Sequence, residues 1–227
     1  MRSHVVAISA LALSGCLAPL DTGGLKTSDL RASFNVSYSS GSVTCSAYFY
    51  SEANGYSYVV LDDDDFVTCD GKIMTSTGSG GYSVNVPYVA GKEYQMALIR
   101  KAESTYVAHV SVPSLPTGTT PVVGATVVSA QELTVTWVAS TDPRDETVVQ
   151  VTNGLSGSSA IFANRAQKPE TGHVLFTSTE MRAPVPTGGT RSGSISFYRT
   201  RYGAMPTGLA GEISSFRGSG YTIFIQD

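Results

Sequence analysis

Strict alternation of apolar and polar positions begins near residue 30 and recurs along the rest of the chain. Leu30 to Tyr38 alternates in this way, and the alternation resumes over 43–49 after a Ser/Gly turn. A period of two is typical of a half-buried strand, and two such runs joined by a short turn predict a hairpin. Further strands are predicted at 56–61, 66–69, 72–74, 82–86, 93–100, 106–112, 133–137, 174–176, 195–200, 213–216 and 221–225.

Composition agrees with this pattern, since the 227 residues include 23 Gly and 12 Tyr and are rich in Ser, Thr and Val. Such usage favours strands joined by tight turns, and the sequence therefore predicts an all-β chain. The proline-rich stretch after residue 112 cannot continue a central strand. We therefore expect a β-sandwich over 30–113, a linker over 114–121 and a second β domain over 122–227. Residues 154–172 fit either a strand or a short helix.

The second domain contains Trp137, the one tryptophan of the chain. Leu133, Val135 and Trp137 share one face of a strand, and a polar turn at 142–145 precedes another apolar alternation. The stretch 133–151 resembles the opening hairpin of fibronectin type III and related immunoglobulin-like domains. This resemblance implies two tandem immunoglobulin-like β-sandwiches, with Trp137 in the core between two sheets.

The N-terminus has a different pattern: Arg2, then a short apolar run over 5–13 and small residues. This run is far shorter than the roughly 20 residues that a membrane-spanning helix needs. A basic start and a short apolar core are typical of an export signal. The run ends in Leu13-Ser14-Gly15-Cys16, which resembles the lipobox of bacterial lipoproteins. An ordinary secretory signal with a chance cysteine is the alternative.

The lipobox resemblance implies that residues 1–15 are a cleaved signal peptide. Cys16 would then carry a diacylglycerol on its sulfur and a further acyl chain, such as palmitate, on its amine. Residues 16–29 show no period and are predicted to be a flexible tether. The expected location is the cell envelope, with the acyl chains as the membrane anchor. Leu17 differs from the Asp that retains such proteins at the inner membrane, which indicates the outer membrane of a Gram-negative bacterium.

Two cysteines remain, Cys45 and Cys69. An even pair in an exported chain predicts a disulfide. Two buried free thiols are the alternative, and a metal site is disfavoured because no CxxC or paired histidine accompanies them.

The sequence contains few candidates for catalysis. His109 lies in a predicted strand and His173 at the start of another, and no Gly-x-Ser-x-Gly nucleophile elbow or phosphate-binding glycine loop is present. The chain is therefore predicted to be non-enzymatic and to need no cofactor. The formal net charge of −3 lacks the basic character of a nucleic-acid-binding protein.

The densest charged feature is the acidic run from Asp62 to Asp65. Carboxylates are Ca²⁺ ligands, but neighbouring side chains of an extended segment point to opposite sides. Asp62 and Asp64 are therefore only weak candidates for a metal site. The alternative is a solvated acidic turn.

Tyrosines provide the strongest indication of a binding surface. If the apolar residues of 43–49 face the core, Tyr48 and Tyr50 face outward, and Tyr56 and Tyr58 on the next strand return beside them. Such rings suit a glycan, a peptide or another protein, whereas cross-strand pairing that merely stabilises the sheet is the alternative. The sequence thus predicts a lipid-anchored binding or structural module. A Ca²⁺-assisted adhesin, a carbohydrate-binding module, a hydrolase with scattered carboxylates and a subunit of an envelope assembly are the alternatives.

Overall fold

A computed structural model of the chain describes residues 20–22, 25–51, 57–78, 80–101, 103–153, 161–182 and 188–227. The prediction of an all-β chain is confirmed, because one short 3-10 helix, Thr27–Asp29, is the single helical element among these residues. The strands are β1 Leu20–Asp21, β2 Leu30–Ser39, β3 Ser42–Ser51, β4 Ser57–Val60, β5 Phe66–Cys69, β6 Lys72–Ile73, β7 Thr75–Gly78, β8 Gly81–Pro87, β9 Glu93–Ile99, β10 Tyr106–Ser111, β11 Gly118–Thr120, β12 Thr126–Val128, β13 Leu133–Trp137, β14 Asp145–Thr152, β15 Ile161–Gln167, β16 His173–Phe176, β17 Thr190–Tyr202 and β18 Ala210–Gln226.

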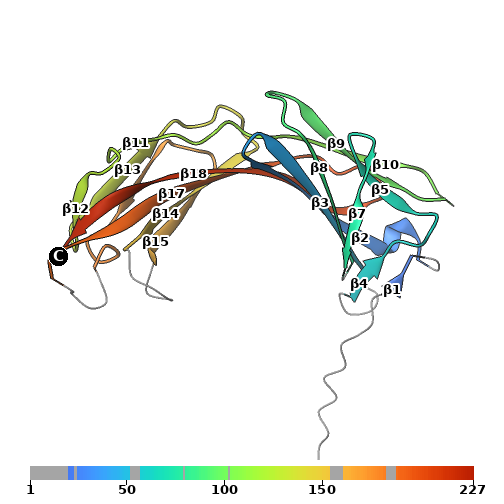
Figure 1. The fold of residues 1–227 in the computed structure, drawn as a ribbon, viewed down its shortest axis with the longest axis horizontal. Helices are drawn as coiled ribbons and strands as arrows, with labels where there is room; N and C mark the ends of the chain where they lie inside the picture. The colour runs from blue at the N-terminus through green and yellow to red at the C-terminus, as the bar shows by residue number, and fades with distance from the viewer. Residues whose placement is uncertain are drawn as a thin grey trace, which may run out of the picture.

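One large sheet and two small sheets organise the described residues. The large sheet has 11 strands in the order β1-β4-β3-β2-β18-β17-β14-β15, with β8 also beside β3, β7 beside β8 and β12 beside β18. The small sheets are β10-β9-β5-β6 and β11-β13-β16. Figure 1 shows the large sheet curved into an arch, with both small sheets on its convex side.

Each small sheet covers its own hydrophobic core, so the two predicted sandwiches are present. The first core includes Phe34, Phe49 and Met96, and the second includes Trp137 and Phe197. Burial of each of these large side chains contributes roughly 1.5–3 kcal/mol. Trp137 is 4% exposed, which matches the core position predicted for it.

The two sandwiches share the large sheet, which the sequence did not predict. Strand β18 pairs with β2 through its first half and with β12 through its last residues, so it contributes to both cores. The sequence pattern divided it into 213–216 and 221–225, because Gly218-Ser219-Gly220 resembles a turn. The strand is continuous there: a Cβ on Gly220 would lie 2.9 Å from the carbonyl oxygen of Ile195, so β17 and β18 approach closely at the glycines.

The predicted hairpin over 133–151 is wrong. β13 pairs with β11 and β16 in a small sheet, whereas β14 pairs with β15 and β17 in the large sheet. The polar turn between them therefore carries the chain from one sheet to the other instead of closing a hairpin. The ambiguous segment before residue 172 contains strand β15 and no helix among its described residues.

The first hairpin and the disulfide are confirmed. β2 and β3 pair in register from Leu30 with Ser51 to Ser39 with Ser42. Cys45 of β3 is bonded to Cys69 of β5, with their Cα atoms 6.3 Å apart, so the bond joins the large sheet to the first small sheet. No helix among the described residues is long and apolar enough to cross a membrane.

Candidate functional site

The concave face of the large sheet is the face that the small sheets leave uncovered (Figure 1). Core-facing residues of β2 and β3 are fully buried, so the residues between them lie on this open face. The register places Tyr50 beside Tyr58 on one side and beside Arg31 on the other. Tyr48 lies beside Ser33 and Gly81.

These residues form a groove of about 490 Å³ that is lined by Ser33, Tyr48, Tyr50 and Tyr58. Tyr48 is 43% exposed and Tyr58 is 53% exposed, so both rings are accessible from the groove. Three of the four tyrosines predicted as a ligand surface are therefore brought together. Tyr56, the fourth, lies outside the described residues.

Two glycines make room for the rings. A Cβ on Gly81 would lie 2.7 Å from Cε1 of Tyr48, and a Cβ on Gly80 would lie 3.1 Å from Cβ of Tyr58. The rings can therefore lie across the backbone of the turn between β7 and β8. The Gly80-Gly81 pair was the available sequence signal for this arrangement, but it also fits an ordinary turn.

Polar side chains continue the open face beyond the groove. Ser33 Oγ lies 3.5 Å from a carboxylate oxygen of Glu212, and Asn35 donates to Ser214 Oγ at 3.3 Å. Near the centre of the arch, Tyr198 and Phe216 stack with ring centres 5.8 Å apart. The groove thus combines flat apolar rings with nearby hydroxyl and charged groups.

The N-terminal segment beside the groove is bound to the first sandwich. β1 pairs in parallel with β4, Leu20 with Val59 and Asp21 with Val60. The Thr22 amide donates to the Val60 carbonyl at 3.1 Å, and both Thr22 and Thr27 are buried. Residues 20–22 and 25–29 therefore differ from the flexible tether that was predicted for 16–29.

The buried guanidinium of Arg100 holds this segment. It donates to the Thr22 carbonyl at 3.0 Å and to Thr27 Oγ1 at 3.1 Å. It also forms ion pairs of 3.0 Å with Asp65 and with Glu103. No sequence pattern predicted this cluster, because Thr22, Asp65 and Arg100 are far apart in the chain.

The acidic run contributes to that cluster. Burial would raise the pKa of Asp65, but hydrogen bonds from Thr22, the Lys101 amide and Arg100 outweigh it and lower the pKa. Asp64 forms an ion pair with Lys101, and Asp62 accepts a hydrogen bond from the Asp63 amide at 2.8 Å. Among the described residues, no three His, Cys, Asp or Glu side chains gather as a metal site would need.

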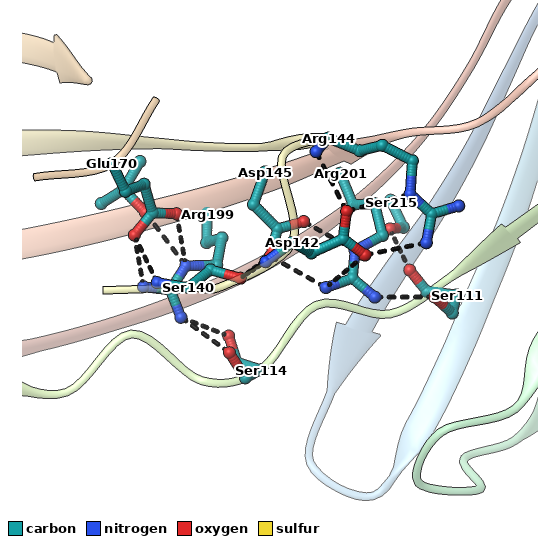
Figure 2. Close-up of polar contacts among 11 residues, drawn as sticks. Ser111, Ser114, Ser140, Asp142, Arg144, Asp145, Glu170, Arg199, Arg201 and Ser215 are labelled. Carbon is teal, nitrogen blue, oxygen red and sulfur yellow. Dashed lines mark hydrogen bonds and ion pairs between the residues drawn. The ribbon is translucent and has the colours of Figure 1, made fainter. Parts of the chain in front are cut away.

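A second polar cluster lies where the two sandwiches meet (Figure 2). Arg199 and Glu170 have side chains that are each 1% exposed, and they form a bidentate ion pair at 2.6 and 2.8 Å. Trp137 Nε1–H and Thr147 Oγ1–H also donate to Glu170, at 3.1 and 2.7 Å. Burial would raise the pKa of Glu170, but these hydrogen bonds and the amide of Ser140 lower it.

A neighbouring ion pair extends the cluster. Arg201 donates to both carboxylate oxygens of the buried Asp145, at 2.6 and 2.8 Å, and lies 3.4 Å from Asp142. The side-chain hydrogen bond from Arg144 is the largest cause of the low pKa of Asp142; its burial acts in the opposite direction. The carboxylates that converge here are therefore held by arginines, as Figure 2 shows.

Hydrogen bonds from the cluster and from β18 also hold the proline-rich segment between the two sandwiches. Arg201 donates to Ser111 Oγ at 2.8 Å, and Ser215 donates to the Ser111 carbonyl at 2.7 Å. Arg199 donates to Ser114 Oγ at 2.8 Å and to its carbonyl at 3.2 Å, and Ser219 donates to the Pro116 carbonyl. The segment predicted as a linker, 114–121, is thus bonded to β17 and β18 and contains β11.

His109 and His173 make none of the contacts that form the two clusters. His109 is exposed on β10 and pairs with Ala204 in an isolated bridge. His173 is exposed at the start of β16, and its Nδ1 lies 3.3 Å from the Thr171 carbonyl oxygen. No hydrogen bond joins either ring to a carboxylate or a hydroxyl among the contacts found in the described residues.

No protein-family description and no curated protein sequence matches this chain. Solved structures similar to it include the fibronectin(III)-like modules of Clostridium thermocellum CbhA, at 13% identity over 86% of this chain and 90% of that one, with a TM-score of 0.29. Chicken CNTN1 FN1-FN3 domains are 11% identical over 87% and 64% of the two chains, with a TM-score of 0.27. A chain of a cytokine receptor complex is 11% identical over 84% and 99%, with a TM-score of 0.30. Similarities this distant carry no inference about ligand or activity.

Proposed function

We propose that this chain is a lipid-anchored, non-enzymatic binding module of the cell envelope, held at the outer membrane by acyl chains on Cys16. Its binding site is the tyrosine groove, formed by Ser33, Tyr48, Tyr50 and Tyr58. This assignment of the binding site rests on one observation: three partly exposed tyrosines line a single groove on an uncovered face of the sheet. Rings of this kind offer rigid, partly polar contact area at low entropic cost.

The non-enzymatic part of the proposal is supported by the state of the carboxylates. Glu170, Asp145 and Asp142 come close together, but each is paired with an arginine. Low pKa values keep Glu170 and Asp142 ionised, and a carboxylate in that state is a poor general acid.

The anchoring part of the proposal is supported by the sequence of residues 13–16, which lie outside the described residues. The disulfide is consistent with an exported protein, because such bonds persist in oxidising compartments. Each buried CH₂ of an acyl chain contributes about 0.8 kcal/mol, so two or three chains anchor a protein durably.

Mass determination of the mature N-terminus, with acyl labelling, tests the anchor. We expect a lipidated Cys16 in the native chain, and a Cys16→Ser chain that no longer sediments with membranes once these have been washed to remove reversibly bound protein. Sedimentation of the Cys16→Ser protein equal to that of the native protein would contradict lipid anchoring.

Binding of the purified Cys16→Ser protein to isolated cell envelopes tests the groove, because that protein has no lipid of its own. Replacing Tyr48 and Tyr50 together by Ser should weaken envelope binding at least tenfold, since anchoring aromatic residues typically contribute more than 1 kcal/mol each. Tyr202→Ser is the matched control, because Tyr202 is also exposed on the open face but lies outside the groove. Equal loss in both proteins, or no loss in either, would remove the groove as the binding site.

A further inference from the structure

We infer that the tyrosine groove binds the lipid headgroup layer of the same membrane that holds the acyl anchor. The end of the arch that contains β1 and β4 then lies against the bilayer. This inference rests on the proposed function, because it needs both the lipid on Cys16 and the groove. It names the partner of that groove.

The short segment between Cys16 and Leu20 limits the distance between the groove and the membrane. Four peptide steps separate Cys16 from Leu20, and a fully extended chain covers at most about 14 Å over that distance. Leu20 pairs with Val59, whose neighbour in β4 is Tyr58. Since paired strands lie about 4.8 Å apart, the backbone of Tyr58 lies within roughly 20 Å of the lipidated residue.

The bonds of the N-terminal segment keep this distance short. If residues 16–29 were a free tether, the groove could lie well away from the membrane in any orientation. Thr22 is instead buried: its backbone N–H donates to the Val60 carbonyl, and its own carbonyl accepts a hydrogen bond from Arg100. Three residues, 17–19, separate Cys16 from Leu20, the first described residue that pairs with β4.

Strand direction places the groove, and not the acidic turn, on the anchor side. Because β1 and β4 are parallel, the step from Asp21 back to Leu20 has the same direction as the step from Val60 to Val59, toward Tyr58. The run from Asp62 to Asp65 follows β4 in the opposite direction. The acidic run meets the N-terminal segment at Thr22, two residues farther from Cys16 than Leu20, and there Asp65 is paired with Arg100.

The chemistry of the groove fits a headgroup layer. Tyrosine is enriched at membrane–water interfaces, because its ring is apolar and its hydroxyl can bond to headgroups. The exposed Lys26 in the N-terminal segment adds a cation that anionic phosphates attract. Glu212, the carboxylate on this part of the face, is on β18, two strands beyond Tyr48.

The anchor also allows a weak contact to suffice. A tethered group experiences its target at an effective concentration that can reach the millimolar range. Three tyrosine rings therefore need only modest interfacial affinity to hold the arch in one orientation on the membrane.

Depth-dependent fluorescence quenching tests the inference on the full-length lipidated protein. The protein is reconstituted in vesicles of phosphatidylethanolamine and phosphatidylglycerol that contain lipids brominated near the headgroup end of the acyl chain. Tyr58→Trp places a reporter in the groove. Phe224→Trp is the matched control, since Phe224 is 41% exposed and pairs with β12 in the last part of β18, and that end of β18 lies at the opposite end of the arch from β4 (Figure 1). Trp137 is retained in both proteins as a buried, constant background.

We expect brominated lipids to quench the Tyr58→Trp reporter several-fold more strongly than the Phe224→Trp reporter. Tyr48→Trp provides a second groove position if the first variant does not fold. Equal quenching at both ends, with lipid found on Cys16 by mass, would overturn the inference. If the Tyr48 and Tyr50 double variant still loses envelope binding in that case, the groove binds an envelope glycan or protein and the proposed function survives. A native chain without lipid would overturn the inference together with the anchoring proposal.

Discussion

The two sandwiches attach their small sheets to the shared large sheet by different bonds. In the first sandwich, the covalent bond between Cys45 of β3 and Cys69 of β5 crosses from one sheet to the other. The second sandwich has no cysteine. There, Arg199 of β17 binds Glu170, which precedes β16, and the carbonyl of Val138, which follows β13.

Two connections with the same structural role are therefore sensitive to different conditions. A disulfide acts largely by limiting the unfolded chain and is broken by reductant. A buried ion pair depends on the charge of both partners, and loss of one partner leaves an uncompensated charge in a medium of low polarity. We therefore expect the connection in the first sandwich to be sensitive to reductant, and the connection in the second to be sensitive to acid and to loss of Arg199.

Loss of Arg199 should have the largest effect. Arg199→Met leaves the buried Glu170 without its ion-pair partner, and we expect the free energy of unfolding to fall by about 3–5 kcal/mol. Denaturant unfolding monitored by Trp137 fluorescence measures this loss of free energy. Trp137 is a suitable reporter because its indole N–H donates to Glu170.

Two further variants sharpen that result. Arg144→Met removes a largely exposed partner of Asp142 and should cost less than about 1 kcal/mol. Arg199→Met combined with Glu170→Met removes both buried charges and should recover most of the loss. An Arg199→Met protein no less stable than the Arg144→Met protein would show that the buried pair does not join the sheets.

Loss of the disulfide should have the next largest effect. The two cysteines are 24 positions apart, and replacement of both by Ala should lower the free energy of unfolding by about 2–4 kcal/mol. Because β18 contributes to both cores, we expect tyrosine near-UV circular dichroism and Trp137 fluorescence to shift together. Separate transitions would show that the sandwiches unfold independently despite the shared sheet.

Acid should produce a smaller, graded effect that distinguishes the second sandwich. The folded pKa of Glu170 lies below the ordinary 4.5, so its stabilising contribution is complete above about pH 4.5 and is lost as the pH falls through the folded value. The urea midpoint measured by Trp137 fluorescence should therefore decrease from pH 5 toward pH 3. The decrease should be smaller in the protein with both Arg199→Met and Glu170→Met, and an identical decrease would exclude Glu170 as its source. Asp65 adds an acid-sensitive contribution in both proteins.

Local pattern was enough to predict much of the first sandwich. The alternation over 30–49 predicted β2, β3 and their turn, because a strand with one buried face must place apolar residues at every second position. The same alternation predicted that Tyr48 and Tyr50 point away from the core. Parity of cysteines in an exported chain predicted the disulfide between Cys45 and Cys69.

Tertiary structure decided which sheet each strand joined and which charges were buried. Alternation is the same in either sheet, so it could not predict that β13 and β14 belong to different sheets. Gly218 and Gly220 are typical of a turn, so the pattern did not predict that β18 is continuous. Arg100 and Arg199 look like ordinary surface residues in sequence, yet each collects partners from several distant segments. The alternation along the chain was enough to predict the strands and faces of the first hairpin, because alternation depends on neighbours a few residues away, and the even number of remaining cysteines was enough to predict the disulfide. The shared arch, the bound N-terminal segment and the ionic bond across the second core depend on contacts that form only when distant segments meet.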